Sequence, residues 1–318
     1  MAKRKKNIKK TSRKNVSKKR TDENTPIKTL GLKEFYFSNI KKLFYIPFII
    51  LLIAFFLIGQ KIATTGDFIN KGVSLSGGIS LTISTSTLTV ETLSSDMEFN
   101  FNNPDFTVRS ISSGGEQKAL ILESAEIDAE DLTDFLKSNY ALTNDDMALE
   151  QTGSTLGDRF FKQTGNAIIV ALILMGLVVY AYYRSLVPSF AIMLAALSDM
   201  VITLAVFNIF GLKLTTAGIA AFLMLIGYSV DTNILLSTRV LKRKEGTVDE
   251  RVLGAMGTGL MMNMTTIVAI TVALFISESE TITQIMTILL IGLIADMMNT
   301  WIQNVGILKI YLEKTGGK

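Results

Sequence analysis

The sequence predicts a polytopic α-helical membrane protein with six transmembrane helices and a small external domain between the first two of them. Hydrophobic residues make up 48% of the 318 residues, and the mean hydropathy is +0.38. Soluble globular domains are usually less apolar than this. From residue 166 onward the chain is almost continuously apolar, with only short polar breaks. These observations predict a multi-pass protein of the cell membrane.

The N-terminal segment is strongly basic. Residues 1–42 carry 15 Lys/Arg against 3 Asp/Glu. Low complexity and few apolar residues are typical of disorder, and a basic run next to a membrane span favours contact with anionic lipid headgroups on the cytoplasmic side. Nucleic-acid binding is the alternative, but the span that follows directly favours the membrane. We therefore predict a disordered cytoplasmic tail over residues 1–42, which is too long and too charged for a cleavable signal peptide.

The apolar runs define six spans. The first lies within residues 43–60 and is just long enough to cross a hydrocarbon core. Residues 166–311 form the remaining five-helix bundle, and residues 312–318 form the C-terminus. Polar breaks divide this bundle into spans at about residues 166–183, 189–210, 214–236, 254–276 and 282–306.

The charges in the loops orient these spans. The basic tail, "YYRS", "TRVLKRKEGTVDER" and the C-terminal "EKTGGK" fall on one side, whereas "FGLKL" and the acidic "SESE" fall on the other. Basic loops stay in the cytoplasm. Both termini are therefore predicted to be cytoplasmic.

Residues 61–165 read as an external α+β domain. Strand-like alternation appears at 81–88, two further strands are expected at 106–112 and 118–124, and residues 147–153 could supply the last strand. Helical patterns appear at 89–101 and 128–138. A paired-glycine turn, "SGGEQ", joins the two middle strands. The order βαββαβ is that of a ferredoxin-like domain. This acidic segment contains no nucleophile motif, phosphate loop or metal-ligand cluster, so we expect a binding or levering role.

The amino-acid composition limits the kinds of reaction that the chain can carry out. The chain has no cysteine and no histidine, which excludes thiolate chemistry and the usual neutral-pH proton shuttle. We expect neither enzymatic activity, nor a metal, nor another cofactor.

Polar residues inside the spans are the candidate functional residues. A carboxylate at the centre of a membrane helix costs about 2.5–3.5 kcal/mol, so such residues commonly serve proton or ion transfer. Counting residues along the predicted spans places polar groups from four helices in the middle and inner half of the bilayer. These are Asp199, Asp231, Asn233, Asn263, Asp296, Asn299 and Asn304, with Arg239 at the inner surface.

Each of these residues has a structural alternative. Asp231 could be capped by hydroxyl groups near the interface, and Asp199 could make a hydrogen bond between helices. Arg239 could simply extend to the headgroups, and Asp296 could pack with nearby Asn residues.

Three stretches resemble the SecD/SecF family of protein-export membrane proteins. "NKGVSLSGGISLTI" resembles the family's Gly-x-x-x-x-Gly-Gly signature after the first span, with Gly72, Gly77 and Gly78 at its glycine positions. "GYSVDTNILLSTR" resembles its fourth span, and "IADMMNTWIQNVGILKIYLEK" resembles the last span of archaeal members. The resemblance covers about residues 43–314, and the short insert is similar to that of the SecF branch. In bacterial SecF proteins the fourth-span motif has Asn at the position of Asp231, so this motif is closer to that of SecD.

The resemblance implies a function. SecD and SecF proteins are similar to half of an RND transporter, in which intramembrane charges couple proton flow to movement of external domains. It implies a complex with SecD beside the Sec channel (the SecY complex), and contact with the translocating polypeptide and with membrane lipids. It places the ion coupling at Asp199, Asp231 and Arg239. The depth of Asn233, Asn263, Asp296 and Asn299 along their predicted spans makes them the supporting polar residues. Two alternatives stay open: a self-contained RND-like exporter of small molecules or lipids, and a passive scaffold of the channel.

Overall fold

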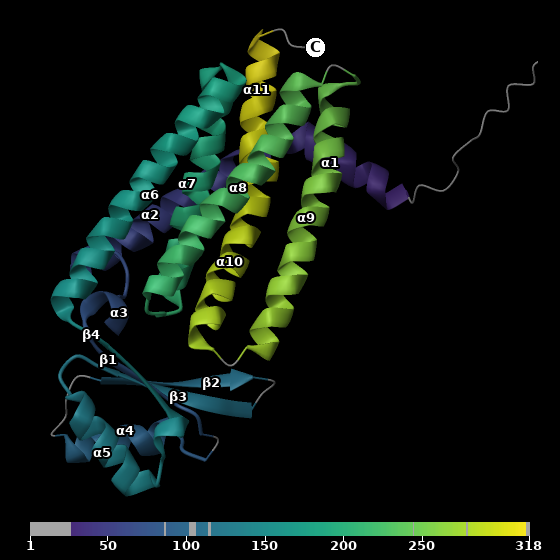
Figure 1. Ribbon diagram of the computed structural model, residues 1–318. Coiled ribbons are helices and arrows are strands. Elements are labelled where there is room, and N and C mark those ends of the chain that lie inside the picture. Colours follow the sequence, from purple (N-terminus) through teal and green to yellow (C-terminus); the bar gives the residue numbers. More distant parts are fainter. Residues whose placement is uncertain are drawn as a thin grey trace, which may run out of the picture. The chain divides into compact units, whose positions relative to one another are not determined.

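The computed structural model describes residues 27–85, 87–101, 106–113, 116–243, 245–277 and 279–315 (Figure 1). The chain has two compact units, residues 1–39 and residues 40–318. In the first unit the described residues belong to α1 (Ile27–Leu43). The sequence predicts disorder for residues 1–42, but the chain is helical from residue 27 onward. Apolar residues recur from Leu30 to Phe37, and two lysines in the last turn interact favourably with the helix dipole. Residues 1–26 of the predicted tail lie outside the described residues.

Six helices in the described part of the chain are long and apolar enough to cross a membrane, which confirms the six-span prediction. The sixth span consists of three consecutive helical segments, and α6 begins well before the predicted span at residue 166. The elements are α2 (Tyr45–Thr65), α6 (Ser154–Tyr183), α7 (Leu186–Ile209), α8 (Thr216–Lys242), α9 (Val248–Ile276), α10 (Glu280–Met298), η2 (Asn299–Asn304) and α11 (Val305–Thr315).

The helices α7, α8 and α10 pack against one another, α2 and α6 pack against α7, and α9 packs against α8 and α10 (Figure 1). In the most apolar stretches of α7 and α8, 56% of the residues are buried, against 11% in α6, so α7 and α8 form the centre of the bundle. Small residues permit the close contacts. A Cβ atom added to Gly292 of α10 would lie 2.4 Å from a methyl carbon of Leu225 of α8.

The segment between α2 and α6 contains a four-stranded antiparallel sheet with the predicted order βαββαβ. The strand order in the sheet is β2-β3-β1-β4, the ferredoxin-like arrangement. A short helix precedes the first strand, and a turn of 3-10 helix precedes the last. The elements are α3 (Val73–Ser76), β1 (Gly78–Ile83), α4 (Val90–Asn100), β2 (Phe106–Ser113), β3 (Glu116–Ser124), α5 (Ala129–Tyr140), η1 (Asn144–Asp146) and β4 (Met147–Thr152).

The position of the first strand differs from the sequence-based expectation. β1 begins at Gly78 rather than at residue 81, and the hydroxyl of Thr85 accepts hydrogen bonds from the backbone of Thr87 and Leu88, which turns the chain toward α4. The helix starts follow the expected chemistry, because the side chains of Thr89 and Asp128 cap α4 and α5. The two glycines of the predicted turn between β2 and β3 lie outside the described residues.

Both faces of the sheet are covered. One face packs on α4 and α5, with Leu120 and Leu122 in the shared apolar core. The opposite face is turned toward the membrane helices (Figure 1). There Arg109 and Ile121 line a cavity of about 310 Å³ together with Gln284 of α10 and residues at the end of α7. Every residue from Ala119 to Ser124 is buried for this reason.

A π-helical segment, η2, interrupts the sixth span. All of its residues except Ile302 are buried. A π turn widens the helix and often occurs at functional sites. Here it turns several polar side chains, including Asn299 and Asn304, toward α7 and α8.

Candidate functional site in the membrane bundle

The carboxylate of Asp199, near the middle of α7, is fully buried. Its Oδ2 atom accepts a hydrogen bond from the hydroxyl of Ser229 of α8 at 2.5 Å. Its Oδ1 atom accepts one from the Nδ2 amide of Asn299 at 2.6 Å. Asp199 therefore joins the three most tightly packed spans.

The carboxylate of Asp296, at the end of α10, is also fully buried. It accepts hydrogen bonds from the Nδ2 amide of Asn263 of α9 at 3.1 Å and from the hydroxyl of Thr300 at 2.9 Å. Asp296 lies beside Asp199, because Asn299 and Thr300, two consecutive residues of η2, donate hydrogen bonds to Asp199 and Asp296 respectively. Residues from α7, α8, α9 and the sixth span thus meet around one pair of carboxyl groups.

Further amides extend this network away from the α+β domain. The Nδ2 amide of Asn233 donates to the backbone oxygen of Ser229 at 2.8 Å, and that of Asn304 donates to Oδ1 of Asn233 at 2.6 Å. The side chain of Gln303 donates to the hydroxyl of Ser198 at 3.4 Å. The buried polar network therefore continues along the interface between α7, α8 and the π segment.

The electrostatics of the carboxyl pair are unusual for a buried site. All four hydrogen bonds to Asp199 and Asp296 described above come from uncharged hydroxyl or amide groups. Two negative charges side by side in a low-dielectric interior repel each other strongly, and a proton or a cation relieves that repulsion. Within the described residues, the side-chain oxygens of Asn263, Asn299 and Asn304 receive no hydrogen bond from the protein. Such an arrangement of oxygen acceptors can take up a proton, water or a small cation.

Asp231 lies outside this network. Its side chain is exposed on α8, and no other described residue forms a hydrogen bond or an ion pair with it. The cause is the helical phase: residues two positions apart lie about 200° apart around a helix. Because Ser229 and Asn233 face inward, Asp231 faces outward. Two of the three predicted carboxylates therefore meet, and the third does not join them.

Arg239 is also separate from the carboxyl pair. It lies ten residues beyond Ser229 on α8, toward the end of the bundle away from the α+β domain. Its Nη1 atom donates to the backbone oxygen of Gly254 at 2.5 Å, a contact that ties α8 to α9.

The sequence-based prediction missed Ser198, Ser229, Thr300 and Gln303 as members of the network. The hydroxyl and amide groups of these residues are common in membrane helices, so composition alone does not single them out. A signal was nevertheless present in α8: Ser229 and Asn233 are four residues apart and share a face with the apolar residues Leu225 and Leu236, which are buried.

The glycine motif lies between α2 and β1. The backbone N–H of Gly72 donates to the backbone oxygen of Leu214 at 2.7 Å. Gly77 and Gly78 have φ values of 88° and 121°, which side chains strongly disfavour. A Cβ atom on Gly78 would also lie 2.5 Å from the backbone oxygen of Ser124. These glycines shape the turn that leads the chain from the membrane into the sheet.

The described residues contain no group of three or more His, Cys, Asp or Glu side chains arranged to hold a metal ion. Fold and site together define a class: a six-span membrane protein with a ferredoxin-like domain and a buried pair of carboxyl groups.

Comparison with known proteins identifies the family. Residues 132–314 match the family described as protein export membrane protein SecD/SecF, C-terminal. The chain is 37% identical over 278 residues to the protein-export membrane protein SecF of Pyrococcus furiosus, covering 87% of this chain and 93% of that protein. It is 37% identical over 284 residues to SecF of Methanolacinia petrolearia, covering 87% and 95%. The chain therefore belongs to the SecD/SecF family of protein-export membrane proteins, as its motifs predicted.

The fold is also similar to a solved structure. The crystal structure of SecDF, a translocon-associated membrane protein from Thermus thermophilus, matches with a TM-score of 0.73 at 18% identity. The match covers 88% of this chain but only 38% of the SecDF chain. This likeness shows a SecDF-like fold, and the present chain spans well under half of that longer protein.

Proposed function

We propose that this chain acts as the SecF subunit of a protein-export complex and couples an ion gradient to movement of its α+β domain. In this proposal it pairs with a SecD subunit beside the Sec channel, and the moving domain pulls or releases the exported polypeptide. Family membership supports the role in export. The buried Asp199–Asp296 pair, shared among four membrane helices, is the observation that supports the coupling.

The proposed coupling uses the repulsion within the carboxyl pair. Entry of a proton neutralises one carboxyl group, and its release restores the repulsion, so the packing of α7 against α10 differs between the two states. One elementary charge moved across 100 mV corresponds to about 2.3 kcal/mol, which shifts a two-state equilibrium about 50-fold. That is sufficient to bias the bundle between two arrangements.

Asp231 and Arg239 stay predicted coupling residues, but their surroundings favour different roles from that of Asp199. A carboxylate exposed on a membrane helix is costly unless a neighbouring protein covers it. We therefore propose that Asp231 meets a polar group of the SecD partner. Arg239 holds α8 to α9 at the cytoplasmic end.

Replacement of Asp199 or Asp296 by Asn tests the proposal in cells that lack the native copy. We expect both variants to insert and to pair with SecD, while export of secreted proteins slows to the rate without the chain. Normal export in both variants would reject the coupling and leave the passive scaffold.

The membrane orientation has its own test. The chain has no cysteine, so single cysteines can be placed at the exposed positions Lys137 in α5 and Glu245 between α8 and α9. A maleimide that cannot cross membranes should label Lys137→Cys in intact cells and Glu245→Cys only after lysis. The reverse pattern would overturn the proposal that both termini are cytoplasmic.

One observation favours a second candidate function, a self-contained exporter of small apolar molecules. A cavity of about 310 Å³ lies among α6, α7 and α8, lined by apolar side chains such as Phe161, Met200 and Phe222. Affinity purification from native membranes discriminates the two. Recovery of SecD and channel subunits supports the first function, and a homo-oligomer with bound lipid supports the second.

A further inference from the structure

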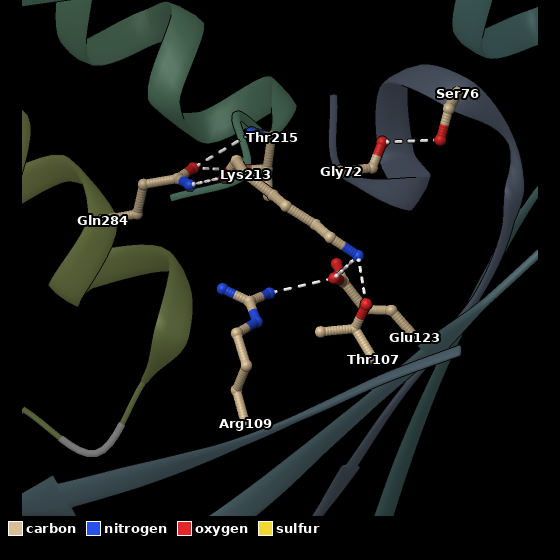
Figure 2. A network of polar contacts seen from close by, with 8 residues as sticks. All are labelled: Gly72, Ser76, Thr107, Arg109, Glu123, Lys213, Thr215 and Gln284. Atoms are coloured by element: carbon tan, nitrogen blue, oxygen red, sulfur yellow. Dashed lines mark hydrogen bonds and ion pairs between the residues drawn. The ribbon is translucent and has the colours of Figure 1, made fainter. Parts of the chain in front are cut away.

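A cluster of charged residues joins the sheet to the membrane helices (Figure 2). Glu123 of β3 has only 2% of its side chain exposed. Its carboxylate pairs with Lys213, in the loop between α7 and α8, at 3.0 Å, and with Arg109 of β2 at 3.0 Å. The Nζ atom of Lys213 also donates to the hydroxyl of Thr107 at 3.0 Å. We call Glu123, Arg109, Thr107 and Lys213 the Glu123 joint.

The geometry of the sheet builds this joint. Thr107 of β2 lies directly opposite Glu123 of β3, and Arg109 lies opposite Ile121. Because side chains alternate along a strand, Thr107, Arg109 and Glu123 share the face that is turned away from α4 and α5. A buried carboxylate is stable only when it is paired, and Lys213 brings one of its two cations from the membrane bundle.

The loop that carries Lys213 (residues 210–215) is itself fixed to the membrane helices. It connects α7 to α8. The side chain of Gln284, in the second turn of α10, accepts a hydrogen bond from the backbone N–H of Thr215 at 3.2 Å and another from the Thr215 hydroxyl. The same side chain donates to the backbone oxygen of Lys213 at 2.6 Å. The ends of α7, α8 and α10 therefore meet at this loop (Figure 2).

All three of these helices contribute residues to the polar network around Asp199 and Asp296. At 1.5 Å per residue, Asp199 lies about 15 Å from the end of α7, and Asp296 lies about 18 Å from Gln284 along α10. Ser229 lies about 20 Å from the start of α8. Helices behave as stiff rods over such lengths. A small displacement of these helices at the carboxyl pair therefore moves the loop by a similar distance.

We propose that the Glu123 joint is the contact through which α7, α8 and α10 move the sheet of the α+β domain. Glu123 and Lys213 are positioning residues in this scheme, since neither touches the coupling ion. The inference rests on the proposed ion coupling and adds the contact that transmits the movement from the membrane helices to the α+β domain.

A second attachment keeps the fold together when the joint is broken. The backbone N–H of Leu214 donates to the backbone oxygen of Asn70 at 2.7 Å, and that of Gly72 donates to the backbone oxygen of Leu214. These bonds tie the loop to the segment before β1 without the side chain of Lys213. Loss of that side chain therefore separates the loop from β2 and β3, while the path of the chain into the domain is kept.

The test measures movement of the domain in the full chain, reconstituted with its SecD partner in proteoliposomes. Fluorophores are attached at Lys137→Cys in α5 and Glu245→Cys in the loop between α8 and α9, and energy transfer is followed as a proton gradient is imposed. We expect a gradient-dependent change in the wild-type background. Lys213→Met and Glu123→Gln should abolish the change, and Lys213→Arg, which keeps the cation, should retain it.

Glu116→Gln is the matched control, because it removes an ion pair with Lys118 on the exposed start of the same strand. This variant should respond as the wild type does. If Lys213→Met and Glu123→Gln respond fully, the joint is not the route. If they fail to assemble, a cysteine pair at positions 107 and 213 bridged by a short bis-maleimide replaces the contact. The fluorophores are then attached to non-canonical azide-bearing residues at positions 137 and 245, so that the two labelling reactions do not compete. This bridged variant should restore the change, and failure to do so would overturn the inference.

Asp199→Asn distinguishes failure of the Glu123 joint from failure of the proposed ion coupling. If Asp199→Asn loses the gradient-dependent change but Lys213→Met keeps it, the ion coupling stands and the joint is rejected. If Asp199→Asn and the wild type respond identically, the proposed function fails, and the inference fails with it.

Discussion

Asn299 donates a hydrogen bond to the carboxylate of Asp199 at 2.6 Å, and so joins the π-helical segment of the sixth span to the middle of α7. The two residues are 100 positions apart in the chain, and both are fully buried. Because η2 widens the helix, several consecutive residues of the sixth span can face the bundle interior. The same turn presents Thr300 to Asp296.

Removal of this hydrogen bond should weaken both the fold and the function. In Asn299→Ala, Asp199 keeps the side-chain hydrogen bond from Ser229 but loses the one from residue 299, and a buried polar group that loses its partner costs about 1–3 kcal/mol. We expect a lower unfolding temperature in detergent and slower export. Ile302→Ala, in the same π segment but outside the set of its buried residues, is the control. An Asn299→Ala protein with unchanged stability would contradict the described network.

Asp231 and Asp199 should behave differently when each is replaced by Leu. Asp199→Leu removes an acceptor from Ser229 and Asn299 and should lower the unfolding temperature of the isolated chain. Asp231→Leu changes an exposed position, so it should leave that temperature unchanged and instead weaken co-purification with SecD. Equal destabilisation of the isolated chain by both variants would contradict the outward placement of Asp231.

The glycine motif should be sensitive at Gly78. An alanine there requires a φ of 121° and places its Cβ atom 2.5 Å from the backbone oxygen of Ser124. We expect Gly78→Ala to destabilise the chain by more than about 1 kcal/mol. Gly153→Ala is the control, since Gly153 has a φ of −70° and open space around it. Thermal unfolding of the two variants side by side checks this, and similar curves would refute it.

Acid should remove a local contribution to stability in the α+β domain. Hydrogen bonds from the Thr143 hydroxyl at 2.6 Å and the Thr143 backbone at 2.9 Å lower the pKa of Asp146 from its usual 3.8. A carboxyl group with a lowered folded-state pKa stabilises the fold above about pH 3.8, and this stabilisation is lost as the pH falls through the lower folded-state value.

The unfolding temperature of Asp146→Asn should therefore lie below that of the wild type at pH 6, and the difference should shrink as the pH falls below about 4. Asp145→Asn is the control, because the hydrogen bonds of Thr143 go to Asp146. A difference that stays constant from pH 6 to pH 3 would show that the charge of Asp146 is not responsible.

The sequence predicts the architecture well because its strongest signals are physical constraints on single elements. Apolar runs must be long enough to span a membrane, and the order of strand and helix patterns between α2 and α6 leaves few folds. The candidate site was predicted less well. Asn263 contacts Asp296 and Asn299 contacts Asp199, but a residue count along a span gives only the depth of a residue in the membrane and not the side of the helix on which it lies.

Asp231 illustrates why the side of the helix matters as well as the depth. Its depth matches that of a buried carboxylate, yet Ser229 two residues earlier occupies the inward face. The π turn over Asn299–Asn304 is a second case, because it depends on packing against α7 and α8 rather than on local propensity. The pairing of Lys213 with Glu123 is a third, since it joins residues 90 positions apart on separate layers of the fold.

Proton flux through proteoliposomes that contain the complete complex tests the central claim most directly. The wild-type complex, Asp199→Asn and Asp296→Asn are compared under an imposed gradient, with Glu116→Gln as the control. The account predicts flux in the wild type and in the control, and none in either carboxyl variant. Undiminished flux in both Asp199→Asn and Asp296→Asn would contradict it.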